Sequence, residues 1–215
     1  MPDKFDVKEL EGRGIFPTAG KNYGYDFMPV EKLNTPITPR ENWDLYFARE
    51  PMCWIPDQPS DTNYIMPDFI PDNVAEGPGG GYDNFGVKWI PCSNPMLPAF
   101  IEPGFIRIRD IAGIDDFPWP DVDSWPWKEG APPFLALDQD RINSGILMAG
   151  MFERMTMVFG FEDAAAYFLT DPEYVHKFLD KLLEINCKLI RNFHTYFKTD
   201  IIFFHDDWGA QKAPF

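Results

Sequence analysis

The chain has 215 residues, 45% hydrophobic and 25% charged, which is enough apolar material to bury a sizeable core. Its 34 acidic and 19 basic residues give a net charge of −15, and such a surface repels nucleic-acid phosphates and anionic lipid headgroups. Three isolated cysteines, no apolar run near the roughly 20 residues of a membrane span and no signal-peptide pattern indicate a cytoplasmic protein. We therefore expect a small-molecule substrate and neither nucleic acid nor membrane as a partner.

The first part of the chain, residues 1–38, lacks sustained periodicity and is predicted to be an N-terminal arm. A helix is predicted directly after it. Thr38 can act as its N-cap, Pro39 suits the first helical position, and Glu41 completes a capping box. A short strand is predicted at residues 53–55.

The middle of the chain, residues 56–133, is rich in proline and aromatic residues. Strands are predicted in the second half of 83–90 and at 105–109, where apolar and basic residues alternate. The prolines between residues 117 and 127 exclude regular structure there, and so much aromatic area predicts a layer that covers another part of the fold.

The pattern becomes that of an α/β protein after Pro133. A buried strand is predicted at 134–137, a helix at about 143–159 and a second helix from about Glu162. The clearest helix begins at Asp171 and Pro172, and the apolar run 201–204 predicts a parallel strand buried on both faces. A long helix, a buried strand and polar residues at the end of that strand are typical of βα units.

The best candidates for chemistry follow that last strand: His205, Asp206 and Asp207. Carboxylates at the carboxyl end of a buried strand are poorly solvated, which suits proton transfer. Because side chains alternate along a strand, His205 and Asp207 should share one face while Asp206 points to the other. The alternative is that an aspartate here caps the next helix or pairs with a neighbouring residue of the barrel.

Five further residues are candidates for substrate binding. Asp140 follows the predicted 134–137 strand. It would either line the same end of the fold as His205 or cap the following helix. Asp83 follows a glycine run and is more simply explained as a turn-forming residue, with Phe85 close by. Trp208 and Gln211 extend the segment after the last strand. No motif of metal-ligand spacing is present, so no metal ligand is predicted within this chain.

Four stretches, taken together, resemble the uroporphyrinogen decarboxylase-like superfamily, and most closely its members from anaerobic bacteria. They span much of residues 38–215 and are Thr38–Trp43, Asp83–Trp89, Phe152–Glu162 with Asp171–Glu173, and Asp206–Gly209. The resemblance implies a (β/α)8 TIM barrel whose active site lies at the carboxyl ends of the strands. Residues 39–215 would then be the N-terminal portion of that barrel, too short to close eight strands and left with an unpaired edge.

The resemblance implies three alternatives for function. The first is a methyltransferase that moves a methyl group from a small donor to a corrinoid protein, with Asp206 or Asp207 protonating or orienting the leaving group. The second is a porphyrinogen decarboxylase of tetrapyrrole biosynthesis, although the R-Q-A-G-R-Y arginine motif of such enzymes is absent here. The third is a non-catalytic barrel fragment. The superfamily's zinc ligands, an H-x-C motif and a distant Cys, would lie outside this chain, so any cofactor is expected on a partner or elsewhere.

Overall fold

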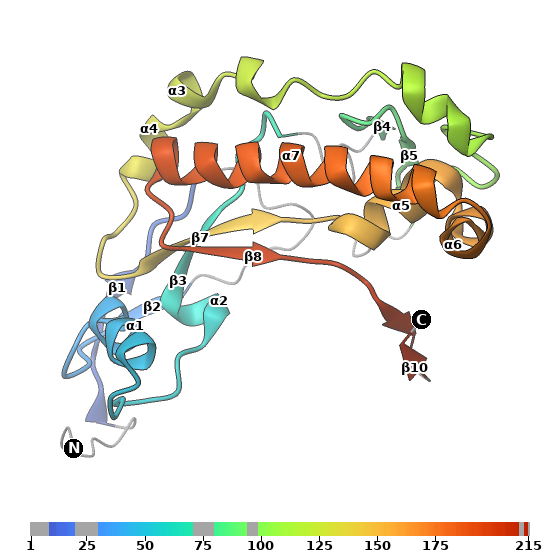
Figure 1. The fold of residues 1–215 in the computed structure, drawn as a ribbon. Coiled ribbons are helices and arrows are strands. Elements are labelled where there is room, and N and C mark those ends of the chain that lie inside the picture. The colour runs from blue at the N-terminus through green and yellow to red at the C-terminus, as the bar shows by residue number, and fades with distance from the viewer. Residues whose placement is uncertain (1–8, 20–29, 71–79, 94–98, 211–212, 215) are drawn as a thin grey trace.

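The computed structural model describes residues 9–19, 30–70, 80–93, 99–210 and 213–214 (Figure 1). Its centre is a parallel sheet of three strands in the order β3 (Thr62–Ile65), β7 (Ile142–Leu147) and β8 (Ile201–Phe204). The path from β7 to β8 runs through α5 (Met151–Phe159), α6 (Phe161–Thr170) and α7 (Pro172–Phe197). This is a βαβ unit, as the predicted βα pattern requires.

The long helix α7 lies between two layers (Figure 1). On one side it packs on the sheet, where Gly145 of β7 gives it room. A Cβ at that glycine would lie 2.7 Å from the Phe193 ring. On the other side lie short turns: 3-10 helices at Ile111–Asp116 and Val122–Ser124, α3 (Trp127–Gly130) and α4 (Pro132–Leu135).

The predicted aromatic layer between residues 117 and 127 covers α7. The Trp119 ring lies 5.3 Å from the Phe178 ring, and Trp127 lies 5.8 Å from Phe193. The Trp127 indole N–H is satisfied inside the protein, because it donates to the Val122 carbonyl at 2.6 Å. These rings bury their area against the helix rather than against a separate element, so the core runs on both sides of α7.

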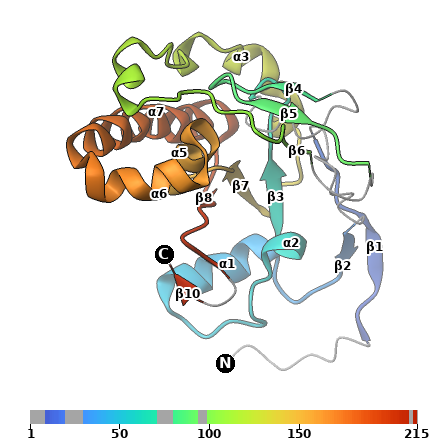
Figure 2. The same ribbon diagram turned by 90° about the vertical axis from the view of Figure 1, so that its right-hand side faces the viewer.

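Smaller elements surround the central sheet. An antiparallel sheet of β4 (Gly81–Tyr82), β5 (Lys88–Ile90) and β6 (Phe100–Ile101) lies beyond the carboxyl end of β3, whereas α1 (Pro39–Ala48) lies at its amino end (Figure 2). The one-turn helix α2 (Gln58–Asp61) leads into β3. Two hairpins complete the described elements: β1 (Gly12–Ile15) with β2 (Glu31–Leu33), and β9 (Gly209–Ala210) with β10 (Ala213–Pro214).

Helix α1 forms as the sequence predicts. The Thr38 side chain accepts from the Glu41 amide, and the Glu41 carboxylate accepts from the Thr38 amide. Arg40 attaches α1 to the sheet, because its guanidinium donates to both carboxylate oxygens of Asp200 at 3.0 Å. Asp200 directly precedes β8, so α1 closes the amino edge of the sheet.

Several predicted elements are wrong. Residues 134–137 are not a strand, since Pro132 and Pro133 begin a helical turn there. Residues 142–147 form the central strand β7. The helix that was expected at about 143–159 therefore starts only at Met151. Residues 53–55 and 105–109 form no strand, and the described part of the predicted arm contains the β1–β2 hairpin.

The α/β class with a parallel sheet is confirmed, while the described strands do not close into a barrel. Strand β8 is not buried on both faces as predicted. It pairs only with β7 among the described strands, and Phe203 and Phe204 are 38% and 40% exposed. No described helix is both long and apolar enough to cross a membrane.

Candidate functional site

The parallel strands place His205 and Asp207 together at the carboxyl end of β8. The His205 amide extends the pairing of β8 with β7 by donating to the Leu147 carbonyl at 2.9 Å. His205 Nε2 lies 3.6 Å from a carboxylate oxygen of Asp207. The predicted alternation is therefore confirmed: these two side chains share one face.

Asp206 points the other way and caps helix α5. One oxygen of its carboxylate accepts from the amides of Met151 (2.8 Å) and Phe152 (3.1 Å), and the other accepts from the amide of Glu153 (2.8 Å). The residue at the start of α5, Gly150, has no side chain that could do this. Asp206 therefore satisfies three amides that a helix leaves open at its N-terminus, where negative charge is also favoured. The alternative placed such a cap on the next helix, whereas Asp206 caps α5, which comes earlier in the chain.

Glu153 completes the group around His205. Its carboxylate oxygen lies 3.1 Å from His205 Nδ1, and the Glu153 and His205 side chains are 21% and 33% exposed. A carboxylate on Nδ1 orients an imidazole and favours the tautomer that leaves Nε2 free to exchange a proton. Asp207, 71% exposed on the solvent side, lies beyond hydrogen-bond distance of that Nε2. The arrangement can therefore perform general acid–base chemistry.

The turn that brings α5 to this edge is tightly built. Ala149 is buried and has φ of 56°, a left-handed conformation that costs energy for an alanine. At the next residue, a Cβ on Gly150 would lie 2.5 Å from the Cβ of Asp206 and 2.7 Å from the His205 carbonyl oxygen. The β7–α5 turn therefore fixes Glu153 and the end of β8 relative to each other.

Trp208, the next residue after Asp207, packs on helix α5. Its ring stacks on Phe152 with centroids 5.0 Å apart and an interplanar angle of 28°, and the side chain is 49% exposed. An exposed aromatic face beside His205 offers a contact surface to a bound molecule. Gln211, the other candidate in this segment, lies outside the described residues.

Asp83 and Phe85 lie inside the protein rather than at the sheet edge. Asp83 accepts from the amides of Phe85 and Val87, both at 2.9 Å, which is the turn-forming role. Its other oxygen accepts from Arg154 at 3.1 Å, and both of these charged side chains are essentially buried. The Arg154 guanidinium also lies 4.1 Å from the centre of the Phe85 ring. All these contacts are structural, and they leave the carboxylate enclosed.

Asp140 lies at the opposite edge of the sheet from His205. Asp140 was expected at the carboxyl end of a strand at 134–137, but no strand forms there. It comes just before β7 and therefore lies at the amino end of that strand. Its carboxylate accepts from Lys32 at 2.5 Å, and Lys32 also binds Asp138 at 2.8 Å. Those hydrogen bonds raise the pKa of Lys32. Asp140 lines a cavity of about 320 Å³ at this amino edge, remote from the acid–base group.

The residues present do not form a metal centre. Among the described residues, no three His, Cys, Asp or Glu side chains are arranged to hold a metal ion. The two neighbours of His205 have other uses, since Glu153 orients the ring and Asp207 points into solvent. The zinc ligands that the resemblance implies, an H-x-C motif and a distant Cys, are expected outside this chain.

Sequence patterns did not single out Glu153, because it lies 52 residues before its partner His205. Its one signal in the sequence is that Glu153 lies within Phe152–Glu162, one of the stretches that resemble the superfamily. Neither protein-family models, nor curated proteins, nor solved structures give a match to this chain.

Proposed function

We propose that this chain provides the acid–base site of a methyltransferase of the uroporphyrinogen decarboxylase-like superfamily, which moves a methyl group from a small donor to a corrinoid protein. The observation that carries the proposal is the His205–Glu153 pair at the carboxyl end of β8. In α/β sheets and barrels this edge is where ligands bind. The four stretches that resemble the superfamily supply the reaction class.

The proposed role of His205 follows from the geometry. When the methyl group leaves its donor, the electron pair of the broken bond remains on the donor's heteroatom. A proton from Nε2 of His205 would neutralise that atom, while Glu153 would hold the ring through Nδ1. Asp206 takes the structural role, because its oxygens are engaged by α5. We therefore assign the proton transfer to His205 rather than to Asp206, with Asp207 3.6 Å from Nε2 of the ring.

The charges around His205 favour methyl transfer over porphyrinogen decarboxylation. The charged side chains in contact with it are carboxylates, those of Glu153 and Asp207. A porphyrinogen carries several carboxylates of its own, which such a site repels. A neutral donor meets no such repulsion.

The test is an anoxic assay in which the chain, free cob(I)alamin and a methyl donor are mixed and the loss of cob(I)alamin absorbance is followed. Methanol and methoxybenzene serve as donors, because each leaves an oxygen anion that a proton would neutralise. We expect transfer from at least one donor, and a fall of about 100-fold or more in His205→Gln. The matched control, His176→Gln on the exposed side of α7, should keep the wild-type rate.

Glu153→Gln separates positioning from catalysis. This variant should lower the rate less than His205→Gln, because the imidazole is still present but the carboxylate that holds its Nδ1 is lost. The proposal is wrong if the wild-type chain moves no methyl group, or if His205→Gln and His176→Gln behave alike. Loss of carboxylates from uroporphyrinogen, without methyl transfer, would assign the chain to the decarboxylase alternative instead.

A further inference from the structure

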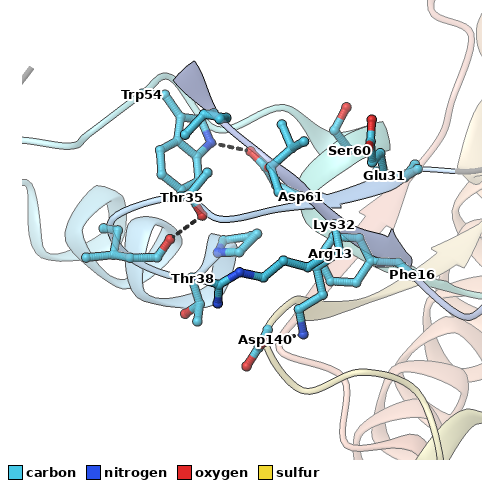
Figure 3. A pocket seen from close by; sticks show the side chains of 15 residues that line it. Arg13, Phe16, Glu31, Lys32, Thr35, Thr38, Trp54, Ser60, Asp61 and Asp140 are labelled. Atoms are coloured by element: carbon cyan, nitrogen blue, oxygen red, sulfur yellow. Dashed lines mark hydrogen bonds and ion pairs between the residues drawn. The ribbon is translucent and has the colours of Figure 1, made fainter. Parts of the chain in front are cut away.

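A second site lies at the amino edge of the sheet, in the cavity of about 320 Å³ (Figure 3). Its walls come from β1, β2, the start of α1 and the residues just before β3 and β7. The volume is at the lower end of the range of about 300–1,000 Å³ that is typical of small-molecule sites. The cavity does not include His205 or its neighbours, so its occupant is a separate question from the proposed reaction.

The apolar wall of this cavity is fixed in place. Phe16 is 5% exposed, and its ring lies between two cations, Arg141 at 4.7 Å and Lys32 at 5.4 Å from its centre. The Trp54 indole N–H donates to Asp61 at 2.8 Å, which holds the second aromatic ring. Preformed aromatic walls bind the apolar body of a ligand with little ordering cost.

Most polar groups of the cavity are already paired inside the protein. Asp61 accepts from the Trp54 indole and from the Asp57 amide, at 2.8 and 2.9 Å. Asp140 accepts from Lys32. The N-terminus of α1 adds no open donor here, because Thr38 and Glu41 bind each other in the capping box.

Arg13 is different. The structure gives it no hydrogen bond or ion pair with any described residue, and its side chain extends across the cavity toward Thr38 (Figure 3). Glu31, the other lining charge without such a partner, lies on another side of the cavity in the same view. A guanidinium presents a planar set of donors that matches a carboxylate with two parallel hydrogen bonds. The Arg13 guanidinium therefore favours an anion with the planar shape of a carboxylate.

We propose that the cavity binds a small monocarboxylate with a compact apolar or aromatic body. The carboxylate binds Arg13, and the body lies between Phe16 and Trp54. A second negative charge is disfavoured, because Asp61 and Asp140 line the same cavity. This site is independent of the proposed methyl transfer and lies at the other edge of the sheet.

The experiment compares three probes of nearly equal shape by isothermal titration calorimetry: phenylacetate, its neutral isostere phenylacetamide, and the cation benzylamine. The wild-type chain should bind phenylacetate about 10-fold more tightly than phenylacetamide, as expected for charged against neutral hydrogen bonding. Benzylamine should bind most weakly. His205→Gln should leave all three affinities unchanged, which separates this site from the proposed catalytic one.

Arg13→Gln tests the assignment of the carboxylate. This exposed substitution should abolish the preference for phenylacetate and leave phenylacetamide binding unchanged. Arg191→Gln, an exposed arginine on α7 with the same change in charge, should behave as wild type. The far-ultraviolet circular dichroism of each variant verifies its fold. A preference that survives in Arg13→Gln, equal affinity for the three probes, or no binding of any of them would overturn the proposal.

Discussion

At the scale of single residues, the end of β8 gives two adjacent side chains different tasks. His205 turns toward Glu153 and Asp207, where its ring can exchange protons. Asp206, one residue later, turns toward the backbone of α5 and accepts three amide hydrogen bonds. The alternation of a strand accounts for the division, and the open N-terminus of α5 accounts for the task given to Asp206.

Removing that cap should weaken the fold. Asp206→Ala leaves the α5 amides without their acceptor, and we expect the free energy of unfolding to fall by about 1–2 kcal/mol. Urea denaturation followed by circular dichroism measures it. Asp207→Ala, at a side chain that is 71% exposed, should change the same quantity by less than about 0.5 kcal/mol. Equal losses in the two variants would contradict the capping role.

The candidate site could be predicted only in part from the sequence. The strand 201–204 and the period of two that follows it place His205 and Asp207 together, and both are local properties. The choice of Glu153 as partner is not local, since it depends on the turn at Ala149 and on how α5 returns to the sheet. The role of Asp206 could not be predicted for the same reason, because its carboxylate binds the first amides of α5, a helix about 50 residues earlier in the chain.

At the scale of elements, a buried ion pair joins the β4–β5 turn to α5. Asp83 and Arg154 are 3.1 Å apart, and their side chains are 0% and 1% exposed. Trp89 adds its indole N–H to the same carboxylate at 3.1 Å. The pair holds the antiparallel sheet against the helix that carries Glu153.

Breaking this pair should be costly, because it removes the negative charge that the buried Arg154 guanidinium faces at 3.1 Å. For Asp83→Asn we expect a loss of about 3–5 kcal/mol in the free energy of unfolding. Asp116→Asn, with the same chemical change at an exposed position, should cost less than about 0.5 kcal/mol. Thermal and urea unfolding measure both variants. A small effect at Asp83 would show that the remaining groups rearrange to solvate Arg154.

Elements with local signals were predicted well, and those without were not. The capping box before α1 and the proline that opens α7 fix their helices through nearby atoms. Strand β7 has the sequence INSGIL, in which three polar or small residues hide the strand pattern. The cause is tertiary: the Asn143 side chain accepts from the Asn63 amide and donates to the Lys198 carbonyl at the end of α7, and Gly145 makes room for Phe193.

At the scale of the whole molecule, Lys32 ties the β1–β2 hairpin to the amino edge of the sheet. It binds Asp138 and Asp140, which precede β7. Burial opposes the ionisation of Asp138, but the hydrogen bonds from Lys32 and from the Asp140 amide outweigh it and lower the pKa of Asp138 below its ordinary value of 3.8. The pKa of Lys32 is raised above its ordinary value of 10.5 by its hydrogen bonds to Asp138 and Asp140. Among the described residues, Lys188 likewise meets two carboxylates, those of Asp123 and Glu184.

The attachment should therefore contribute stability only between two pH limits. Because the pKa of Asp138 is lowered by folding, its contribution is present above about 3.8 and is lost as the pH falls through the lowered value. Because the pKa of Lys32 is raised, its contribution is present below about 10.5 and is lost as the pH rises through the raised value. Both groups are partly solvated, so screening limits the total to about 1 kcal/mol.

Lys32→Met tests these limits. Near neutral pH its melting temperature should lie about 2–4 °C below that of the wild-type chain. This difference should shrink as the pH falls through the lowered pKa of Asp138 and as it rises through the raised pKa of Lys32. Lys128→Met removes an exposed lysine elsewhere and should show no such window. Melting curves from pH 2 to 12 at constant ionic strength measure the difference. If the difference stayed constant across that range, Lys32 would act through the packing of its stem on Phe16 rather than through the two carboxylates.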